Sequence, residues 1–197
     1  MRKLLSTLAI LLLVGTAHAE MPGPDAVVKS TANEVLETLK SDKDLANGDT
    51  SKLGHIVEDK IASKFDFNRM SRLVLGAKWK EASREQQERF IGEFRSLLIR
   101  TYSSALAKYK NQTIEYKPLH DDPNSKDATV MTKVVQPDGT SIALDYTLTK
   151  TDNSWKVYDV SIDGLSLIST YRGQFAETVK QSGIDGLIEK LSAKNKS

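Results

Sequence analysis

Amphipathic helices are predicted for the first half of the chain, because apolar residues recur there every three or four positions. The first helix is expected after Pro24, with Asp25 as its N-cap and an apolar face formed by Val28, Ala32, Val35, Leu36 and Leu39. A polar turn at Asn47–Gly48 precedes a second helix, whose apolar positions are Leu53, Ile56, Val57 and Ile61. A short third helix follows Phe65–Phe67 and stops at Gly76; its apolar positions are Met70, Leu73 and Val74.

The strongest helical pattern begins at Ser83, which has the capping-box spacing with Gln86. One long apolar face follows, formed by Phe90, Phe94, Leu97, Leu98, Tyr102, Ala105, Leu106 and Tyr109. Charged residues such as Arg89 and Glu93 occupy the other side, as they do in a helix that packs one face against a core. The pattern predicts an amphipathic helix of roughly 25 residues.

The spacing then changes from helical to alternating, which indicates β-strands. Strands are expected at Ile114–Tyr116, 128–136, 141–149 and Trp155–Ile162. Pro137–Gly139 joins the middle two strands by a turn that is typical of a hairpin. In the third strand Asp145 is expected to point away from the alternating apolar positions, which are Ile142, Leu144, Tyr146 and Leu148. The sheet therefore has one apolar face that another layer must cover.

Two helices are predicted to close the chain, the first after Gly164 and the second after Gly183. Their apolar positions are Leu167, Ile168, Tyr171 and Phe175 in the first, and Ile184, Leu187, Ile188 and Leu191 in the second. The order of elements predicts an α+β protein with helices packed on one face of a curved four-stranded antiparallel sheet. Helices and sheet could enclose an apolar pocket, although periodicity does not distinguish an open pocket from a filled core.

The N-terminus has the pattern of a secretory signal peptide. Arg2 and Lys3 precede an apolar run, and the small residues around His18 predict cleavage after Ala19. We therefore expect a signal peptide at residues 1–19 and a single exported domain at residues 20–197. The full chain has 28 basic and 26 acidic residues, and the loss of Arg2 and Lys3 leaves 26 of each. This balance argues against nucleic-acid binding, which needs a clustered basic surplus.

The sequence gives little support to catalysis or metal binding. The chain has no cysteine, which excludes thiol chemistry and thiolate ligands. His55 and His120 have no second ligand at metal-binding spacing, and Asp121–Asp122 next to His120 fits a polar turn. Ser166 lacks the second glycine of a nucleophile elbow, and no phosphate-binding or dinucleotide-binding loop is present. We expect neither an enzyme nor a cofactor.

Two segments resemble the MlaC family, the periplasmic phospholipid-binding components of the lipid-asymmetry (toluene-tolerance) ABC transport system. In FDFNRMSRLVLGAKWKEASREQQERFIGEFRSLLIRTYSSAL the resemblance lies in Phe65, Asp66, Phe67, Met70, Leu75, Gly76, Trp79, Gln86, Phe90, Phe94, Thr101 and Tyr102. In WKVYDVSIDGLSLISTYRGQFAETVKQSGIDGLIEKL it lies in Val157, Tyr158, Asp159, Val160, Gly164, Ser166, Tyr171, Arg172, Phe175, Gly183 and Leu187. The two segments frame nearly the whole exported chain.

The resemblance implies an NTF2-like arrangement with a deep apolar pocket between sheet and helices. It implies a carrier in the periplasm of a Gram-negative bacterium, which shuttles phospholipid between the inner and outer membranes and maintains outer-membrane lipid asymmetry. The partners so implied are an inner-membrane ABC transporter with its lipid-binding ring subunit and an outer-membrane lipoprotein–porin complex.

In such a pocket the predicted acyl-chain contacts are the apolar residues of helices and sheet, namely Leu73, Phe90, Phe94, Leu97, Leu98, Tyr102, Ile142, Leu144, Tyr146, Leu148, Val157, Ile168, Tyr171 and Phe175. Two residues keep alternative interpretations. Trp79 either plugs a helix junction or lies at the pocket mouth. Arg172 either pairs with an acid, Asp66 or Asp159, or lies near a phosphate.

Two other functions remain open at this point. An enzyme on an NTF2-like scaffold would use a similar pocket, but it would need an inward-facing acid or base, and the alternation offers none. A periplasmic chaperone would expose a wide apolar groove for extended peptides. Neither function has a sequence feature in its favour.

Overall fold

The computed structural model describes residues 21–46, 52–106, 111–119 and 125–196. The predictions for the signal peptide, the Asn47–Gly48 turn, Tyr109 and His120–Asp122 lie outside these residues. The helices before the sheet are α1 (Pro24–Ser41), α2 (Lys43–Ala46), α3 (Leu53–Ile56), the π-helical η1 (Val57–Ile61), the 3-10 helix η2 (Ala62–Lys64), α4 (Phe67–Leu75), α5 (Lys78–Glu81) and α6 (Arg84–Leu106). The remaining elements are β1 (Thr113–Tyr116), β2 (Asp127–Val135), β3 (Ser141–Lys150), β4 (Trp155–Ile162), β5 (Leu165–Ser166) and α7 (Leu167–Lys196).

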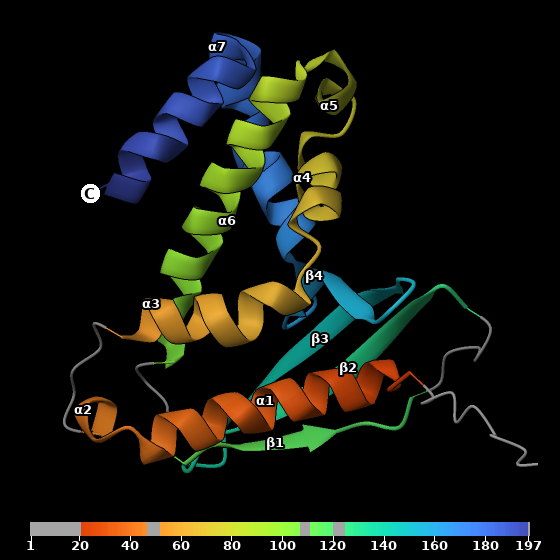
Figure 1. Ribbon diagram of the computed structural model, residues 1–197, viewed down its shortest axis with the longest axis vertical. Coiled ribbons are helices and arrows are strands. Elements are labelled where there is room, and N and C mark those ends of the chain that lie inside the picture. Colours follow the sequence, from red (N-terminus) through yellow and green to blue (C-terminus); the bar gives the residue numbers. More distant parts are fainter. Residues whose placement is uncertain (1–20, 47–51, 107–110, 120–124, 197) are drawn as a thin grey trace, which may run out of the picture.

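An antiparallel sheet forms the lower part of the molecule, and α4, α6 and α7 stand above it (Figure 1). α1 lies across the sheet, with its C-terminal end on the left of that view and with α3 above it (Figure 1). The predicted α+β class is therefore confirmed, whereas the specifically NTF2-like arrangement stays a prediction. The second predicted helix is a single helical stretch that passes from α-helix through π-helix to 3-10 helix between Leu53 and Lys64.

Within the described residues the sheet has five strands in the order β1-β2-β3-β4-β5, so the prediction of four strands was wrong. The extra strand arises because Asp163 and Gly164 adopt φ angles of 48° and 81°, which turn the chain back onto β4. The Asp163 carboxylate accepts a hydrogen bond from the Ala143 N–H at 2.9 Å, which holds this turn against β3. The register also shifts between Thr147 and Leu148, as at a β-bulge, which bends the paired strands.

The start of α6 and the break in α7 agree with those predicted from the sequence, whereas the N-cap of α1 does not. In the predicted capping box of α6, the Gln86 side chain accepts from the Ser83 N–H at 2.9 Å and Ser83 Oγ accepts from the Gln86 N–H at 3.2 Å. Gly183, at a φ of 68°, divides α7 into two helices as predicted. Asp25 is not the N-cap of α1: Gly23 takes that position because the proline that follows is suited to the first helical turn.

In the part of the chain that the structure describes, buried apolar side chains form two clusters. The helical core joins α4, α6 and α7, and its most deeply buried members are Met70, Phe90, Phe94, Leu187 and Ile188. The sheet core lies between α1 and the strands and consists of Val28, Ala128, Val130, Leu148, Trp155, Val157 and Val160. Phe65 and Leu167 pack against both clusters and so connect them.

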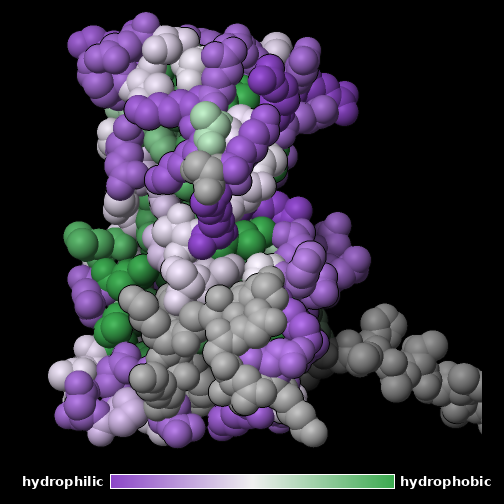
Figure 2. All heavy atoms as spheres, turned by 90° about the vertical axis from the view of Figure 1, so that its left-hand side faces the viewer, coloured by the Kyte–Doolittle hydropathy of each residue, from purple (hydrophilic) through white to green (hydrophobic). Residues whose placement is uncertain are grey.

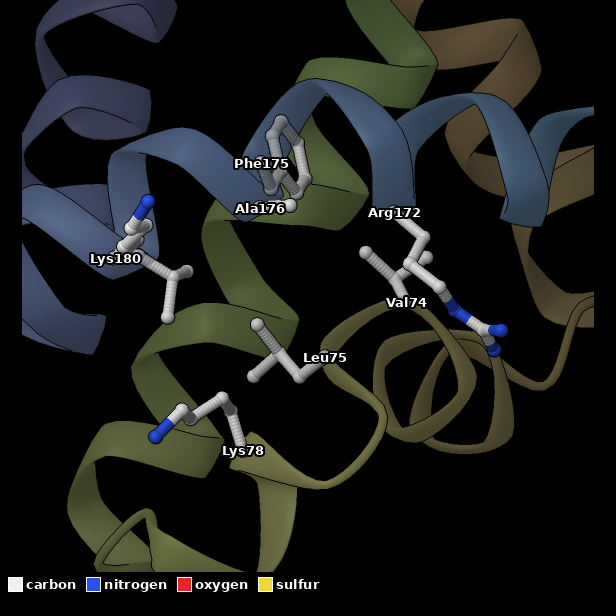
Figure 3. Close-up of a pocket in the computed structure, with 8 residues that line it drawn as sticks. Val74, Leu75, Lys78, Arg172, Phe175, Ala176 and Lys180 are labelled. Atoms are coloured by element: carbon white, nitrogen blue, oxygen red, sulfur yellow. The ribbon is translucent and has the colours of Figure 1, made fainter.

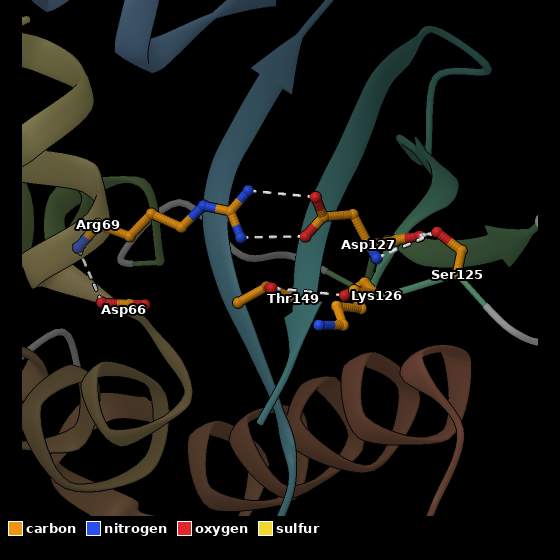
Figure 4. Close-up of polar contacts among 6 residues, drawn as sticks. All are labelled: Asp66, Arg69, Ser125, Lys126, Asp127 and Thr149. Carbon is orange, nitrogen blue, oxygen red and sulfur yellow. Dashed lines mark hydrogen bonds and ion pairs between the residues drawn. The ribbon is translucent and has the colours of Figure 1, made fainter. Parts of the chain in front are cut away.

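A polar joint fixes α4 to the sheet (Figure 4). The Arg69 guanidinium donates to both carboxylate oxygens of Asp127, at 3.0 and 3.2 Å, and lies 3.6 Å from the centre of the Tyr158 ring. This hydrogen-bonded ion pair holds the pKa of Asp127 below its ordinary value. Asp66 caps α4 by accepting from the Arg69 N–H at 2.8 Å, and its own N–H donates to Val157 O at 2.8 Å. The joint lies where β2 begins, which leaves the β2–β3 hairpin at the opposite end of the sheet.

Candidate functional site

The inward positions of the strands form one continuous apolar face. Leu148 pairs with Ala128 on one side and with Val157 on the other. Two residues earlier on β3, Tyr146 pairs with Val130 and Val160. Directly opposed residues of antiparallel strands lie on the same face, so these rows extend across β2, β3 and β4. The next rows, toward the β2–β3 hairpin, join Thr132, Leu144, Ile162 and Leu165, and then Ile114, Val134 and Ile142.

Coverage of this apolar face decreases from one end to the other. Near the joint, Leu148 is fully buried in the sheet core. Toward the β2–β3 hairpin, Leu144 and Ile162 are half-buried, Ile142 is 37% exposed and Leu165 is 72% exposed. We call the six side chains at this end the open apolar end; they are Ile114, Val134, Ile142, Leu144, Ile162 and Leu165. An apolar surface left uncovered beside a well-packed core is typical of a binding site.

Helices border the open apolar end. The N-terminal part of α1 packs Val27 and Val28 on the sheet core, while Leu36 and Leu39 further along α1 are half-buried and belong to neither core. α1 contacts β2 and η1, and η1 in turn contacts α6. Half-buried apolar side chains from η1 and from the C-terminal half of α6 also lie outside the helical core, namely Ile61 and Ile99. Some apolar side chains of the sheet and of these helices are thus left only partly covered.

Figure 2 looks onto the left-hand side of Figure 1, where α1 and α6 have their C-terminal ends. Strongly hydrophobic side chains gather there in a patch at the left edge of the view, below the helical upper part. Hydrophilic side chains cover most of the other described surface in that view.

The polar groups on the apolar face are tyrosine and threonine hydroxyls. Thr132 Oγ1 donates to the Leu144 carbonyl at 2.8 Å, so it is satisfied within the sheet. The Tyr116 hydroxyl is buried and has no hydrogen-bond partner among the described residues. Burial raises the pKa of Tyr116, and burial together with Tyr116 raises the pKa of Tyr146 to about 12. These hydroxyls therefore stay protonated at neutral pH and can donate hydrogen bonds but not act as bases.

The inward positions of the described strands include no aspartate, glutamate or histidine. Within the described ranges, no group of three or more histidine, aspartate and glutamate side chains is placed to hold a metal ion. The arrangement is therefore suited to an apolar ligand that needs few polar contacts.

Nine of the fourteen predicted ligand contacts lie in or against the helical core, namely Leu73, Phe90, Phe94, Leu97, Leu98, Tyr102, Ile168, Tyr171 and Phe175. Four of their rings, from Phe90, Phe94, Tyr171 and Phe175, pack with centroid separations between 5.3 and 6.1 Å. Phe90 and Phe94 are fully buried by this packing. Tyr102 lies at the edge of the cluster, half-buried, where burial and the Tyr171 hydroxyl raise its pKa.

The other five predicted contacts lie on the sheet. Leu148 and Val157 belong to the sheet core, Tyr146 packs against it, and Leu144 and Ile142 lie at the open apolar end. The structure therefore does not gather the fourteen residues around one space, and which of them contact a ligand stays a prediction. Ile114, Val134, Ile162 and Leu165 were not on the predicted list. The first three could have been found from strand alternation, whereas Leu165 depends on the unpredicted strand β5.

Arg172 and Trp79 have structural contacts. The Arg172 guanidinium donates twice to the Leu73 carbonyl, with its Nε at 2.9 Å, and thus binds the last turn of α4. The alternative in which Arg172 pairs with Asp66 or Asp159 is wrong, because the guanidinium binds a backbone carbonyl and both carboxylates serve as helix caps. Asp159 accepts from Ser166 Oγ at 2.6 Å and from the Ile168 N–H at 3.2 Å, at the start of α7. Trp79 is half-buried against the helical core, in line with a plug at the helix junction.

None of the helices in the described ranges is long and apolar enough to cross a membrane. Fold and site define an α+β protein in which helices cover one face of an antiparallel sheet and leave part of that face open. The MlaC family model matches residues 29–193, and the chain belongs to the MlaC family. The resemblance seen in the sequence is thereby confirmed.

Named relatives agree with this assignment. The chain is 30% identical over 163 residues to the toluene tolerance protein ttg2D of Pseudomonas putida, which covers 82% of this chain and 75% of that protein. It is 26% identical over 187 residues to the intermembrane phospholipid transport system binding protein MlaC of Haemophilus influenzae, covering 93% and 87% of the two chains. Among solved structures it is similar to a phospholipid-binding protein of Ralstonia solanacearum in complex with a phospholipid. That similarity has a TM-score of 0.82 and 40% identity, and it covers 88% of this chain and 97% of the other.

Proposed function

We propose that this protein is a periplasmic phospholipid carrier that binds acyl chains at the open apolar end of its sheet. The observation that carries the proposal is the uncovered apolar face of β3, β4 and β5, on which Leu165 is 72% exposed and Ile142 is 37% exposed. A soluble domain keeps such a surface at a cost unless a ligand or partner covers it. The relative from Ralstonia solanacearum, solved with a phospholipid, supports a lipid as that ligand.

The need for a carrier follows from the hydrophobic effect. Moving one methylene group from water into an apolar site gains roughly 0.8 kcal/mol. A lipid with about 30 methylenes would therefore lose on the order of 20 kcal/mol if it crossed an aqueous compartment unprotected. A protein that replaces the membrane as apolar surroundings removes most of this barrier.

The acyl chains would contact the half-buried side chains at the open end, with Leu144 and Ile162 at the centre and Tyr102 from α6 at the helical side. The Tyr116 hydroxyl, which lies on the row of Leu144 and is unpartnered among the described residues, would be a donor for an ester oxygen of the ligand. The remaining predicted contacts, such as Phe94 and Leu148, would support this surface from the two buried cores. Such a site discriminates weakly between acyl chains.

The proposed route of the lipid is between the two membranes of a Gram-negative envelope. The signal peptide predicted at residues 1–19 would deliver the protein to the periplasm. There it would exchange lipid with an inner-membrane ABC transporter and its lipid-binding ring subunit, and with an outer-membrane lipoprotein–porin complex. The names of the relatives, an intermembrane phospholipid transport protein and a toluene tolerance protein, support this route. The proposal includes no catalytic step.

Native mass spectrometry of the chain purified from the periplasm, followed by lipid extraction, tests the proposed function. We expect a protein species that carries an added mass, and we expect that mass to extract as phospholipid. A protein that is empty, and remains empty after incubation with phospholipid vesicles, would overturn the proposal.

A further inference from the structure

A second candidate site lies in the upper part of the molecule, among the helices that stand above the sheet (Figure 1). It is a groove of about 430 Å³ between α4–α5 and the first half of α7 (Figure 3). We call it the basic groove. Its lining residues are Val74, Leu75, Lys78, Arg172, Phe175, Ala176, Val179 and Lys180. The proposed function uses none of them to contact lipid, and three of them, Val74, Leu75 and Phe175, belong to the helical core.

Three cations surround a small apolar floor in the basic groove. Figure 3 shows Lys78, Arg172 and Lys180 spaced around Leu75, Phe175 and Ala176. No lining residue is acidic. Lys78 is paired at 2.6 Å with Glu81, which does not line the groove, and Arg172 is bound to the Leu73 carbonyl. With Lys78 neutralised by Glu81, the local positive charge of the groove comes from Arg172 and Lys180, although the exported chain has equal numbers of acidic and basic residues.

The floor offers an acyl chain only a small area of open apolar surface. Val74, Leu75 and Phe175 are each at most 8% exposed, so a hydrocarbon chain in the groove would gain little contact with them. A flat bilayer surface would not reach a floor recessed between helices. An acidic protein segment fits both features, because its carboxylates can pair with the cations while one or two small apolar side chains contact Ala176, which is exposed, and Val179, which is half-buried.

We propose that the basic groove docks an acidic amphipathic segment of a protein partner. The inference rests on the proposed function, because a carrier must meet membrane-bound components and then leave them. Contacts dominated by surface charge suit such encounters, since these contacts raise the association rate more than they lengthen the lifetime of the complex. The groove lies in the upper part, whereas the apolar face lies in the sheet below, so a partner held there leaves the lipid site accessible (Figure 1).

Site-specific cross-linking of the full chain in its own cells tests this proposal. p-Benzoylphenylalanine would replace Ala176 on the groove floor, and the cross-linked peptide would be mapped by mass spectrometry. We expect one envelope protein, attached through a segment rich in aspartate and glutamate. Lys180→Glu should lower the cross-linking yield about tenfold, because it reverses one charge of the rim. Lys190→Glu, in the second of the two helices of α7 and outside the groove, should leave the yield unchanged.

A charge exchange makes the test specific. Replacing one acid of the mapped segment by lysine should restore cross-linking to Lys180→Glu. A segment without acids, a product with lipid only, or a yield insensitive to Lys180→Glu would overturn the proposal. Lys180→Glu could instead lose co-sedimentation with phosphatidylglycerol vesicles and keep its protein cross-link. That outcome would assign the groove to membrane binding and would also overturn the proposal. The lipid content of Lys180→Glu, measured by native mass spectrometry, should equal that of the wild type. A wild-type protein without lipid would refute the proposed function, not the docking proposal.

Discussion

Leu144→Trp should abolish phospholipid loading while the protein stays folded. Leu144 lies at the centre of the open apolar end, half-buried, between Thr132 on β2 and Ile162 on β4. The larger indole would occupy the surface on which we place the acyl chains. Because the side chain belongs to neither buried core, the free energy of unfolding should change by no more than about 1 kcal/mol. Lipid occupancy after incubation with vesicles, measured by native mass spectrometry, should fall at least about tenfold, equivalent to about 1.4 kcal/mol of binding free energy.

Lys133→Trp is the matched control for this substitution. Lys133 follows Thr132 on β2, is exposed, and points to the opposite face of the sheet because side chains alternate along a strand. The same indole at that position should leave lipid loading unchanged. If Leu144→Trp is folded and carries normal lipid, the acyl chains do not bind at the open apolar end.

Phe94→Ala should destabilise the protein by about 3–5 kcal/mol. Phe94 is fully buried in the helical core, and its ring centroid lies 5.6 Å from Phe90, 5.3 Å from Tyr171 and 5.9 Å from Phe175. Truncation would leave a cavity among these rings, which form a packed cluster rather than the wall of an open space. A loss of this size is a large fraction of the stability of an ordinary domain. Urea unfolding monitored by circular dichroism measures it.

Comparing lipid-free with lipid-loaded protein separates a core residue from a ligand contact. If Phe94 only fills the core, the substitution should lower the free energy of unfolding equally in both states. If Phe94 contacts the acyl chains, the lipid-free protein should lose much less stability than the loaded one, and our placement of the site would be wrong. Phe67→Ala is the control, because Phe67 is half-buried at the edge of the same core and should cost about half as much.

The helices and the hairpin could be predicted from the sequence because local patterns determine them. The Ser83–Gln86 spacing predicted the start of α6, and both reciprocal hydrogen bonds are present. Gly183 predicted the break in α7, since its φ of 68° is one that glycine adopts without strain. β5 could not be predicted, because a two-residue strand has no periodicity, and it forms only where Asp163 enters the left-handed region.

The candidate site was harder to predict than the fold, because the buried core and the binding surface are built from the same apolar residue types in the same sequence patterns. Phe94 and Leu144 both occupy alternating or helical apolar positions, yet one is fully buried and the other is half-buried outside both cores. Which apolar positions stay uncovered depends on how far α1 extends over the sheet, and that is a property of packing rather than of periodicity. Arg172 shows the same limit: its partner is the Leu73 carbonyl, a backbone group that no sequence pattern singles out.

Methyl NMR with a spin-labelled lipid tests most directly whether phospholipid binds at the open apolar end. The protein would carry ¹³C-labelled methyl groups on isoleucine, leucine and valine, and the phospholipid would carry a nitroxide on one acyl chain. We predict that the lipid broadens the resonances of Ile142, Leu144 and Ile162 and spares those of Leu187 and Ile188, which lie fully buried in the helical core. Broadening centred on Leu187 and Ile188, or no broadening at saturating lipid, would contradict this account.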